Sequence, residues 1–194
     1  MPIALDIALL LPDEVNLLAV ALNRRLEGGQ PGGLTLDADH LPHITLAQFF
    51  VAEGRLDDLR RRVDEAGSGF APIELRVSGL DDATDTAMLV FEESEPLRAL
   101  HAAVMDAARG FEVTGDAAAF HAGAGELPAR DRDVAWVTEY RDQHAYDRYL
   151  PHVTVGHGPG AGPVAPSAFR ADRLVVCRLG RHCTCRVVLH ERRL

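Results

Sequence analysis

One hexapeptide occurs twice in the sequence. Leu-Pro-His-Ile-Thr-Leu at 41–46 returns as Leu-Pro-His-Val-Thr-Val at 150–155, with four positions identical and the other two apolar in both copies. Given the histidine and threonine content of the chain, two such matches would arise by chance on the order of one time in 100,000. Both copies read as short strands with an apolar side. The repeat therefore predicts two equivalent strands that carry the same polar residues.

Side-chain alternation along a strand separates the polar from the apolar residues of each copy. His43 and Thr45 project from one face of the first strand, and His152 and Thr154 project from one face of the second. If the two strands face each other, they form a pocket with two imidazoles and two hydroxyl groups. A neutral imidazole can accept a proton while a protonated one donates, and hydroxyl groups can hold phosphate oxygens.

The two Pro-His-x-Thr strands resemble those of the 2H phosphoesterase superfamily, and most of all the bacterial RNA 2′,3′-cyclic phosphodiesterases known as 2′-5′ RNA ligases. The resemblance implies a bilobal α+β fold that arose by duplication, with both motifs in a central groove. It implies cleavage of a cyclic phosphodiester by His43 and His152 without metal or other cofactor. It also implies that Thr45 and Thr154 bind the phosphate, and that the product carries a 2′-phosphate. The near-identical motifs leave open which histidine is the acid.

The basic residues exclude several mechanisms. All 20 are arginine, and no lysine is present. A Walker-type phosphate loop, a Schiff-base enzyme and a ligase that carries an adenylate on lysine each need that side chain.

Charge is distributed unevenly along the chain. The net charge is −9, with a surplus of basic residues after position 169 and a strongly acidic remainder. An acidic body disfavours binding to long nucleic acid, because such binding neutralises many phosphates. We therefore expect a small cyclic nucleotide or an RNA 3′ end as the substrate. The Arg-rich C-terminal strands are expected to be solvated, although Arg186 could approach a phosphate.

The pattern of apolar residues predicts an α+β fold in one domain spanning residues 1–194, with sheets rich in antiparallel pairs. Helices are expected over 12–27, ending at Gly28-Gly29, and over 54–67 and 95–109. Residues 112–150 are harder to assign and contain a short strand candidate at 134–137. The remaining strands are expected at 3–11, 41–51, 73–77, 87–91, 150–157 and, as a hairpin turning at 180–181, at 173–179 and 183–190.

Other side chains receive weaker assignments. Phe49 and Tyr149 are candidates to line the groove and stack on a nucleobase. Trp136 is expected in the core, and His101 on the surface of its helix. A third His-x-Thr, at His182, lacks the preceding proline and is expected to be structural, with the neighbouring cysteines on the apolar face of the last strand.

Several alternatives remain open. The same pocket could serve another diester, such as an ADP-ribose cyclic phosphate or a 2′,5′-linked oligonucleotide, or could bind a nucleotide without catalysis. A metal hydrolase built on His40 with His43, or His152 with His157, is disfavoured because an odd offset along a strand places two side chains on opposite faces. Three cysteines and no spanning segment predict a reduced, cytoplasmic protein without membrane contact. We expect a monomer.

Overall fold

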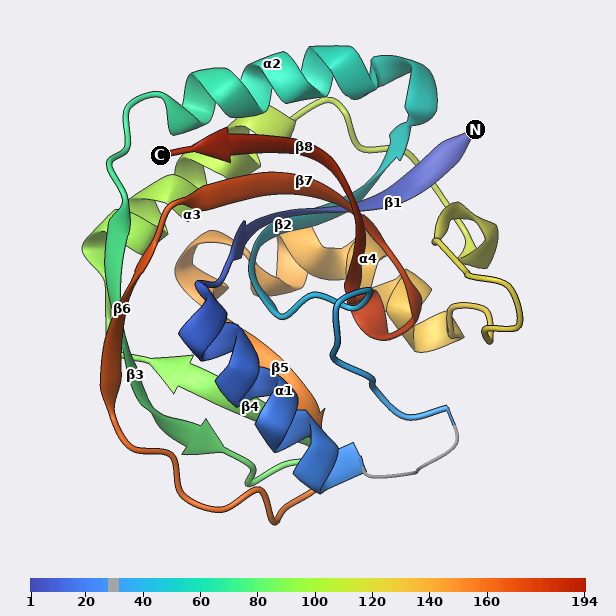
Figure 1. The fold of residues 1–194 in the computed structure, drawn as a ribbon. Coiled ribbons are helices and arrows are strands. Elements are labelled where there is room, and N and C mark those ends of the chain that lie inside the picture. Colours follow the sequence, from blue (N-terminus) through green and yellow to red (C-terminus); the bar gives the residue numbers. More distant parts are fainter. Residues whose placement is uncertain (28–31) are drawn as a thin grey trace.

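The computed structural model describes residues 1–27 and 32–194 (Figure 1). These residues form two four-stranded sheets, four α-helices and several short 3-10 turns, and every pair of neighbouring strands is antiparallel. The α+β prediction is confirmed. The expected helix stop at Gly28-Gly29 lies outside the described residues. No helix in the described part of the chain is long and apolar enough to cross a membrane.

The first sheet has the strand order β2-β1-β7-β8. β1 is central and apolar, and it is buried on both faces over almost its whole length because helices or loops cover each side of the sheet. Asp6 is the one charged residue within β1, and its side chain is fully buried. The strands are β1 (Pro2–Leu10), β2 (His43–Ala52), β7 (Arg173–Leu179) and β8 (Cys185–Arg193).

The second sheet has the order β5-β4-β3-β6. Its four strands correspond to those of the first sheet, because in each sheet the motif strand lies at one edge beside the strand that precedes it in that half. Helical segments connect β1 to β2 in the first half and β4 to β5 in the second. The strands are β3 (Ile73–Asp81), β4 (Thr86–Phe91), β5 (His152–His157) and β6 (Ser167–Ala171).

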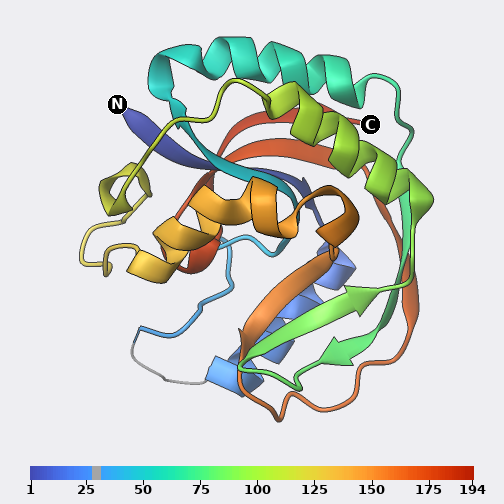
Figure 2. The ribbon, with the colours of Figure 1, turned by 180° about the vertical axis from the view of Figure 1, so that it is seen from behind.

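The helices hold the two sheets together. α2 and α3 pack on each other above the first sheet, α4 packs on β2, and α1 crosses to pack on β5 of the second sheet (Figures 1 and 2). The Ser94 side chain accepts a hydrogen bond from Leu97 N and caps α3, as the sequence Ser-Glu-Pro favours. The helices are α1 (Asp13–Glu27), α2 (Leu56–Gly67), α3 (Glu95–Ala108) and α4 (Asp131–His144).

The strand predicted at 134–137 is wrong, because these residues lie in α4. Asp133 accepts a hydrogen bond from the backbone N–H of Arg130 at 2.8 Å, and this closes the first turn of the helix. The side chains of Val137 and Tyr140 are buried three positions apart, which is a helical spacing. The helix start, rather than the short apolar stretch, decides the local structure here.

The C-terminal hairpin is confirmed as an antiparallel pair, but its turn is longer than expected. A 3-10 turn covers Arg181–Cys183, and β8 begins only at Cys185. Two bulges interrupt the pairing of β7 with β8, so a single alternation does not run along β8. Cys185 is buried as predicted, whereas Val187 is 37% exposed. β6, which precedes this hairpin, was not predicted.

Candidate active site

The two motif strands come together between the sheets. β2 and β5 lie at the edges of their sheets and contact each other. His43, Thr45, His152 and Thr154 all line one cavity of about 480 Å³. The pocket predicted from the repeat thus has all four side chains on its wall.

The two histidine rings are held in the same way. Nδ1 of His43 donates to the carbonyl of Leu41, and Nδ1 of His152 donates to the carbonyl of Leu150, at 2.8 Å in both cases. A carbonyl oxygen only accepts, so each Nδ1 carries a proton. In both motifs the acceptor is the residue before the proline. Each ring therefore uses Nε2 for any other contact.

Each motif strand contains a β-bulge at the equivalent position. In the first half Ala8 pairs with Thr45 and Ile7 with Ala47, so Leu46 is the extra residue. In the second half Met88 pairs with Thr154 and Ala87 with Gly156, so Val155 is the extra residue. A bulge adds one residue to one strand of a pair, so the faces exchange after it.

The bulges decide which later residues reach the cavity. Gln48 and His157, at equivalent positions after the two bulges, both line it. The expectation that His157 faces away from His152 is therefore wrong. The groove-lining assignment of Phe49 is also wrong, because its side chain is 4% exposed and belongs to the main apolar core. Simple alternation from Thr45 would have placed it on the cavity side.

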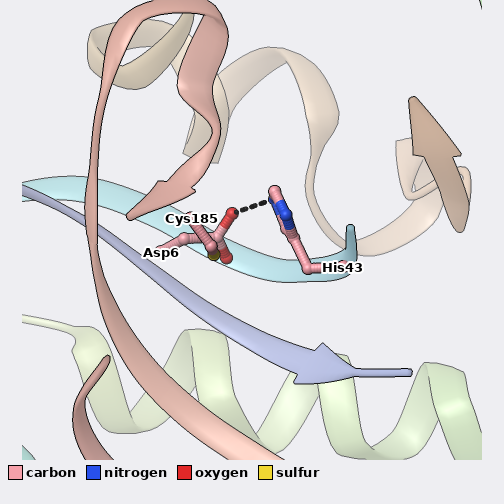
Figure 3. A group of neighbouring side chains, drawn as sticks. All are labelled: Asp6, His43 and Cys185. Atoms are coloured by element: carbon pink, nitrogen blue, oxygen red, sulfur yellow. Dashed lines mark ion pairs between the residues drawn. The ribbon is translucent and has the colours of Figure 1, made fainter. Parts of the chain in front are cut away.

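A buried carboxylate on β1 connects the polar residues of the first motif. Oδ2 of Asp6 accepts hydrogen bonds from Thr45 Oγ1 at 2.7 Å and from Gln48 Nε2 at 2.6 Å, and it lies 3.1 Å from His43 Nε2. Figure 3 shows the imidazole pointing at this carboxylate. Sequence reasoning missed Asp6. The available signal was a single charge inside an otherwise apolar strand.

The two histidines differ in pKa. Burial alone would lower the pKa of His43, but the hydrogen bond and negative charge of Asp6 outweigh it and raise that pKa above its ordinary value. Burial lowers the pKa of His152, and the positive charge of His43 lowers it further. At neutral pH these directions favour a cationic His43 and a neutral His152.

Tyr149 connects the two halves. Its hydroxyl donates to the backbone carbonyl of Thr45 at 2.9 Å, and its ring stacks on His101 with 3.8 Å between centroids. The side chain is buried but contributes to the cavity wall.

His101 is buried, so the surface assignment is wrong. Its Nδ1 donates to the Leu46 carbonyl, and its Nε2 accepts from the backbone N–H of Tyr146, both at 2.7 Å. Burial lowers the pKa of His101 to about 4.

Arg186 lies outside the cavity. Its guanidinium pairs with both carboxylate oxygens of Glu126, at 2.7 and 2.8 Å, and its Nε donates to the carbonyl of Asp39. The suggestion that it approaches the substrate phosphate is therefore not supported. The cavity takes its arginines from a different part of the chain, around α4, namely Arg130, Arg132 and Arg148.

The family model of the 2′-5′ RNA ligase superfamily matches residues 24–174. The chain belongs to the 2′-5′ RNA ligase (2H phosphoesterase) superfamily. The solved structure of TT0787 from Thermus thermophilus matches with a TM-score of 0.66 at 16% identity, over 99% of this chain and 98% of that one. E. coli LigT complexed with 3′-AMP matches with a TM-score of 0.59 at 16% identity, over 100% and 99%. A structure described as a phosphoesterase matches with a TM-score of 0.62 at 14% identity, over 100% and 99%. No curated protein matches the chain in sequence.

Membership of this superfamily supports phosphoesterase activity, and the likenesses to solved structures show the fold.

In this 2H phosphoesterase an aromatic pair also lies on the cavity wall. Trp136 is 38% exposed, so its assignment to the core is wrong. Its indole stacks on the imidazole of His144 with 3.8 Å between centroids, and both residues line the cavity. The pair places a planar aromatic surface beside the arginines of the same wall.

The metal-binding potential of this 2H phosphoesterase is confined to one group. Within residues 1–27 and 32–194, only Asp6, His43 and Cys185 place three possible ligand atoms within 4.8 Å of one another (Figure 3). These residues do not fit a metal site well. Burial raises the pKa of Cys185 well above its ordinary value, so the sulfur keeps its proton, whereas metals bind the thiolate. Asp6 Oδ2 already accepts two hydrogen bonds.

His40, from the metal alternative, and His182, from the third His-x-Thr, have separate roles. Nδ1 of His40 pairs with Asp37 at 2.8 Å, and this side chain does not line the cavity. His182, from the third His-x-Thr, does reach the wall of the cavity, where its Nε2 donates to the carbonyl of Gly32 at 2.9 Å. This contact agrees with a structural role for His182.

Proposed function

We propose that this 2H phosphoesterase hydrolyses a cyclic phosphodiester, with an RNA 2′,3′-cyclic phosphate end or a small 2′,3′-cyclic nucleotide as its substrate. One observation carries the proposal. The two histidines lie on the wall of one cavity, each with Nδ1 fixed on a carbonyl, and Nε2 of His43 lies 3.1 Å from Asp6 Oδ2. This is the arrangement that one acid and one base need around a single phosphate.

The reaction needs two proton transfers. One histidine takes a proton from water as the water oxygen attacks phosphorus, and the other gives a proton to the ribose oxygen as the bond from phosphorus to that oxygen breaks. The product is a phosphomonoester, and we expect it to be the 2′-phosphate. Thr45 and Thr154 lie beside the two histidines. The hydroxyl group of Thr154 can donate to a non-bridging oxygen directly, and that of Thr45 can do so by giving up its hydrogen bond to Asp6 Oδ2. None of these steps calls for a metal or another cofactor.

The composition of the cavity supports a nucleotide as the ligand. Arg132 and Arg148 supply positive charge in a protein whose net charge is −9. The Trp136–His144 pair offers a flat surface for a base. LigT, a fold relative, has been solved in complex with 3′-AMP, NADP+ and ATP. The acidic body argues against long nucleic acid, so we propose a short or small substrate and a monomer in solution.

The test is hydrolysis of 2′,3′-cyclic AMP and of a short RNA with a 2′,3′-cyclic phosphate end, in EDTA, with the products separated by chromatography. We expect turnover by the wild type, and a loss of at least about 100-fold in kcat for His43→Ala and for His152→Ala. His121→Ala is the matched control, because this histidine does not line the cavity.

The same experiment separates the alternatives. Binding of the nucleotide without turnover would indicate a binding module, and activity abolished by EDTA would indicate a metal enzyme. If the enzyme turned over only a 2′,5′-linked dinucleotide or an ADP-ribose cyclic phosphate, its substrate would be that diester and not a 2′,3′-cyclic phosphate. Full activity in both histidine variants would contradict the proposed mechanism with two histidines.

A further inference from the structure

We propose that Asp6 is a positioning residue that makes the two motifs unequal, holding His43 as the proton donor and leaving His152 as the base. This inference rests on the proposed hydrolysis and adds a residue outside both motifs. The motifs are nearly identical in sequence, so the difference between them has to come from their surroundings. Asp6 lies on β1, beside the first motif strand.

The strand register identifies the residue that takes the place of Asp6 in the second half. Asp6, two residues before Ala8, pairs with Gln48, three residues after Thr45. In the same way Thr86, two residues before Met88, pairs with His157, three residues after Thr154. Because the bulge lies at the same point in both pairs, Thr86 is the structural equivalent of Asp6. The first half thus has a carboxylate where the second half has a neutral hydroxyl.

The contacts of its two ring nitrogens favour the protonated form of His43. Nδ1 faces the Leu41 carbonyl and Nε2 faces the Asp6 carboxylate, and both of these groups are acceptors. Facing a carboxylate form of Asp6, the imidazolium, with a proton on each nitrogen, satisfies both contacts. His152 has the same Nδ1 contact, but no carboxylate pairs with its Nε2 among the described side chains. A neutral His152 therefore presents a lone pair on Nε2.

Burial makes the pairing with Asp6 strong. The Asp6 side chain is 0% exposed and that of His43 is 13% exposed, so water screens their interaction little, and the carboxylate favours the charged form of the imidazole. Oδ1 of Asp6 has no hydrogen-bond partner in the described part of the chain, and the contact with His43 is made by Oδ2. The other titratable groups that bear on His43 are Cys177 on β7, Cys185 on β8 and His152 on β5.

Asp6 also orders Thr45. A hydroxyl group has one proton, and that of Thr45 is donated to Asp6 Oδ2. In the second motif, Thr154 Oγ1 makes no hydrogen bond to any described residue, so its proton is available to a phosphate oxygen. The two halves therefore differ at both polar positions. In the reaction, Nε2 of His152 takes a proton from water, and the Nε2 proton of His43 moves from its contact with Asp6 to the leaving oxygen.

The test is the titration of each histidine by NMR of 15N-labelled imidazoles in the free enzyme, together with the pH dependence of kcat/KM. We expect His43 to titrate at least about one pH unit above His152, and the high-pH limb of the rate profile to follow His43. In Asp6→Asn, which keeps the shape and an oxygen acceptor, the pKa of His43 and the high-pH limb should fall together by one unit or more.

Two further variants test the assignment from both halves, one by removing the carboxylate from the first half and one by adding a carboxylate to the second. Asp6→Thr copies the second half into the first and should bring the two histidine titrations together. Thr86→Asp places a carboxylate in the second half, where Thr86 is partly exposed and can accept a charge, and should raise the pKa of His152. His43 titrating at or below His152 in the wild type, or an unchanged His43 in Asp6→Asn, would overturn the proposal. The NMR titration needs no turnover, so an inactive protein with a raised His43 pKa would contradict the hydrolysis and leave the role of Asp6 standing.

Discussion

The hydroxyl of Tyr149, the residue before the second Leu-Pro-His-x-Thr sequence, donates a hydrogen bond of 2.9 Å to the backbone carbonyl of Thr45 in the first. This contact joins the two halves directly, because Thr45 belongs to the first motif and Tyr149 immediately precedes the second. Thr45 lies next to the bulge in β2, where strand pairing is interrupted. The bond therefore satisfies a backbone group at the bulged position and fixes the spacing between the halves.

Removing that hydroxyl should cost both stability and activity. In Tyr149→Phe the buried carbonyl of Thr45 loses this donor, and we expect the free energy of unfolding to fall by about 1–2 kcal/mol in urea denaturation. We also expect kcat to fall several-fold, since Thr45 and its histidine are then less well placed.

Tyr140→Phe is the matched control, because the Tyr140 hydroxyl makes no hydrogen bond to the described residues and the ring is equally buried. Equal losses in Tyr140→Phe and Tyr149→Phe would show that the contact with Thr45 is not responsible.

The only tryptophan of the chain is a built-in reporter of base binding. If a base stacks at the Trp136–His144 pair, 2′-AMP should quench the fluorescence with saturation, whereas ribose 5-phosphate at the same concentration should not. For Trp136→Ala we expect KM for 2′,3′-cyclic AMP to rise by about 10-fold, which is the loss of one stacked base.

The control substrate for this experiment is glycerol 1,2-cyclic phosphate, which has no base. Its kcat/KM should be the same in Trp136→Ala as in the wild type. A fall in kcat/KM for both substrates would indicate that the tryptophan shapes the cavity rather than contacts a base.

Acid should destabilise the fold through His101. The pKa of this buried histidine is lowered to about 4, so between pH 6.5 and 4 the unfolded chain binds a proton that the folded chain does not. Stability is therefore lost as the pH falls through this window, by at most about 3 kcal/mol from this residue. Chemical denaturation at several pH values would measure it.

His101→Gln is the comparison variant, since glutamine can also donate and accept but does not titrate. We expect it to be less stable than the wild type at pH 7 and to lose less stability towards pH 4. Parallel pH dependences for the two proteins would contradict the role given to His101.

Substitutions of Arg186 and Arg148 should have different effects, the first on stability and the second on substrate binding. Arg186→Ala removes the pair with Glu126 outside the cavity, so we expect a lower midpoint of thermal unfolding and unchanged kcat/KM. Arg148→Ala removes a cation from the cavity wall, so we expect KM for a cyclic nucleotide to rise. The reverse pattern would place the phosphate near the C-terminal hairpin.

Much of the site could be predicted because its four polar residues alternate on two short strands of obvious pattern. Asp6 could not, because its partners Thr45 and Gln48 are 39 and 42 residues away and pairing between strands decides the contact. The assignment of Phe49 to the groove is wrong for a related reason, since nothing in the local sequence indicates the bulge at Leu46.

Other failures reflect tertiary structure that outweighs local pattern. Trp136 has an apolar side chain among valines, yet the helix formed by these residues turns it towards the cavity. His101 lies among alanines in a helix that looked solvated, yet Tyr149, 48 residues later in the chain, covers it. In both cases the deciding contact comes from a packing partner that periodicity alone does not reveal.

The paired bulges change how a site of this kind should be sought in other sequences. In both strands the side chains that face the cavity follow the histidine at offsets of two and five residues, not two and four. A profile that counts only even offsets would score Ala47 and Gly156, which lie off the cavity wall, and would pass over Gln48 and His157. The useful signature is therefore His-x-Thr-x-x-(Gln or His), read together with the residue across the strand from its last position. Under the proposed mechanism, that cross-strand residue, Asp6 in one half and Thr86 in the other, sets the direction of proton transfer although it lies outside both motifs.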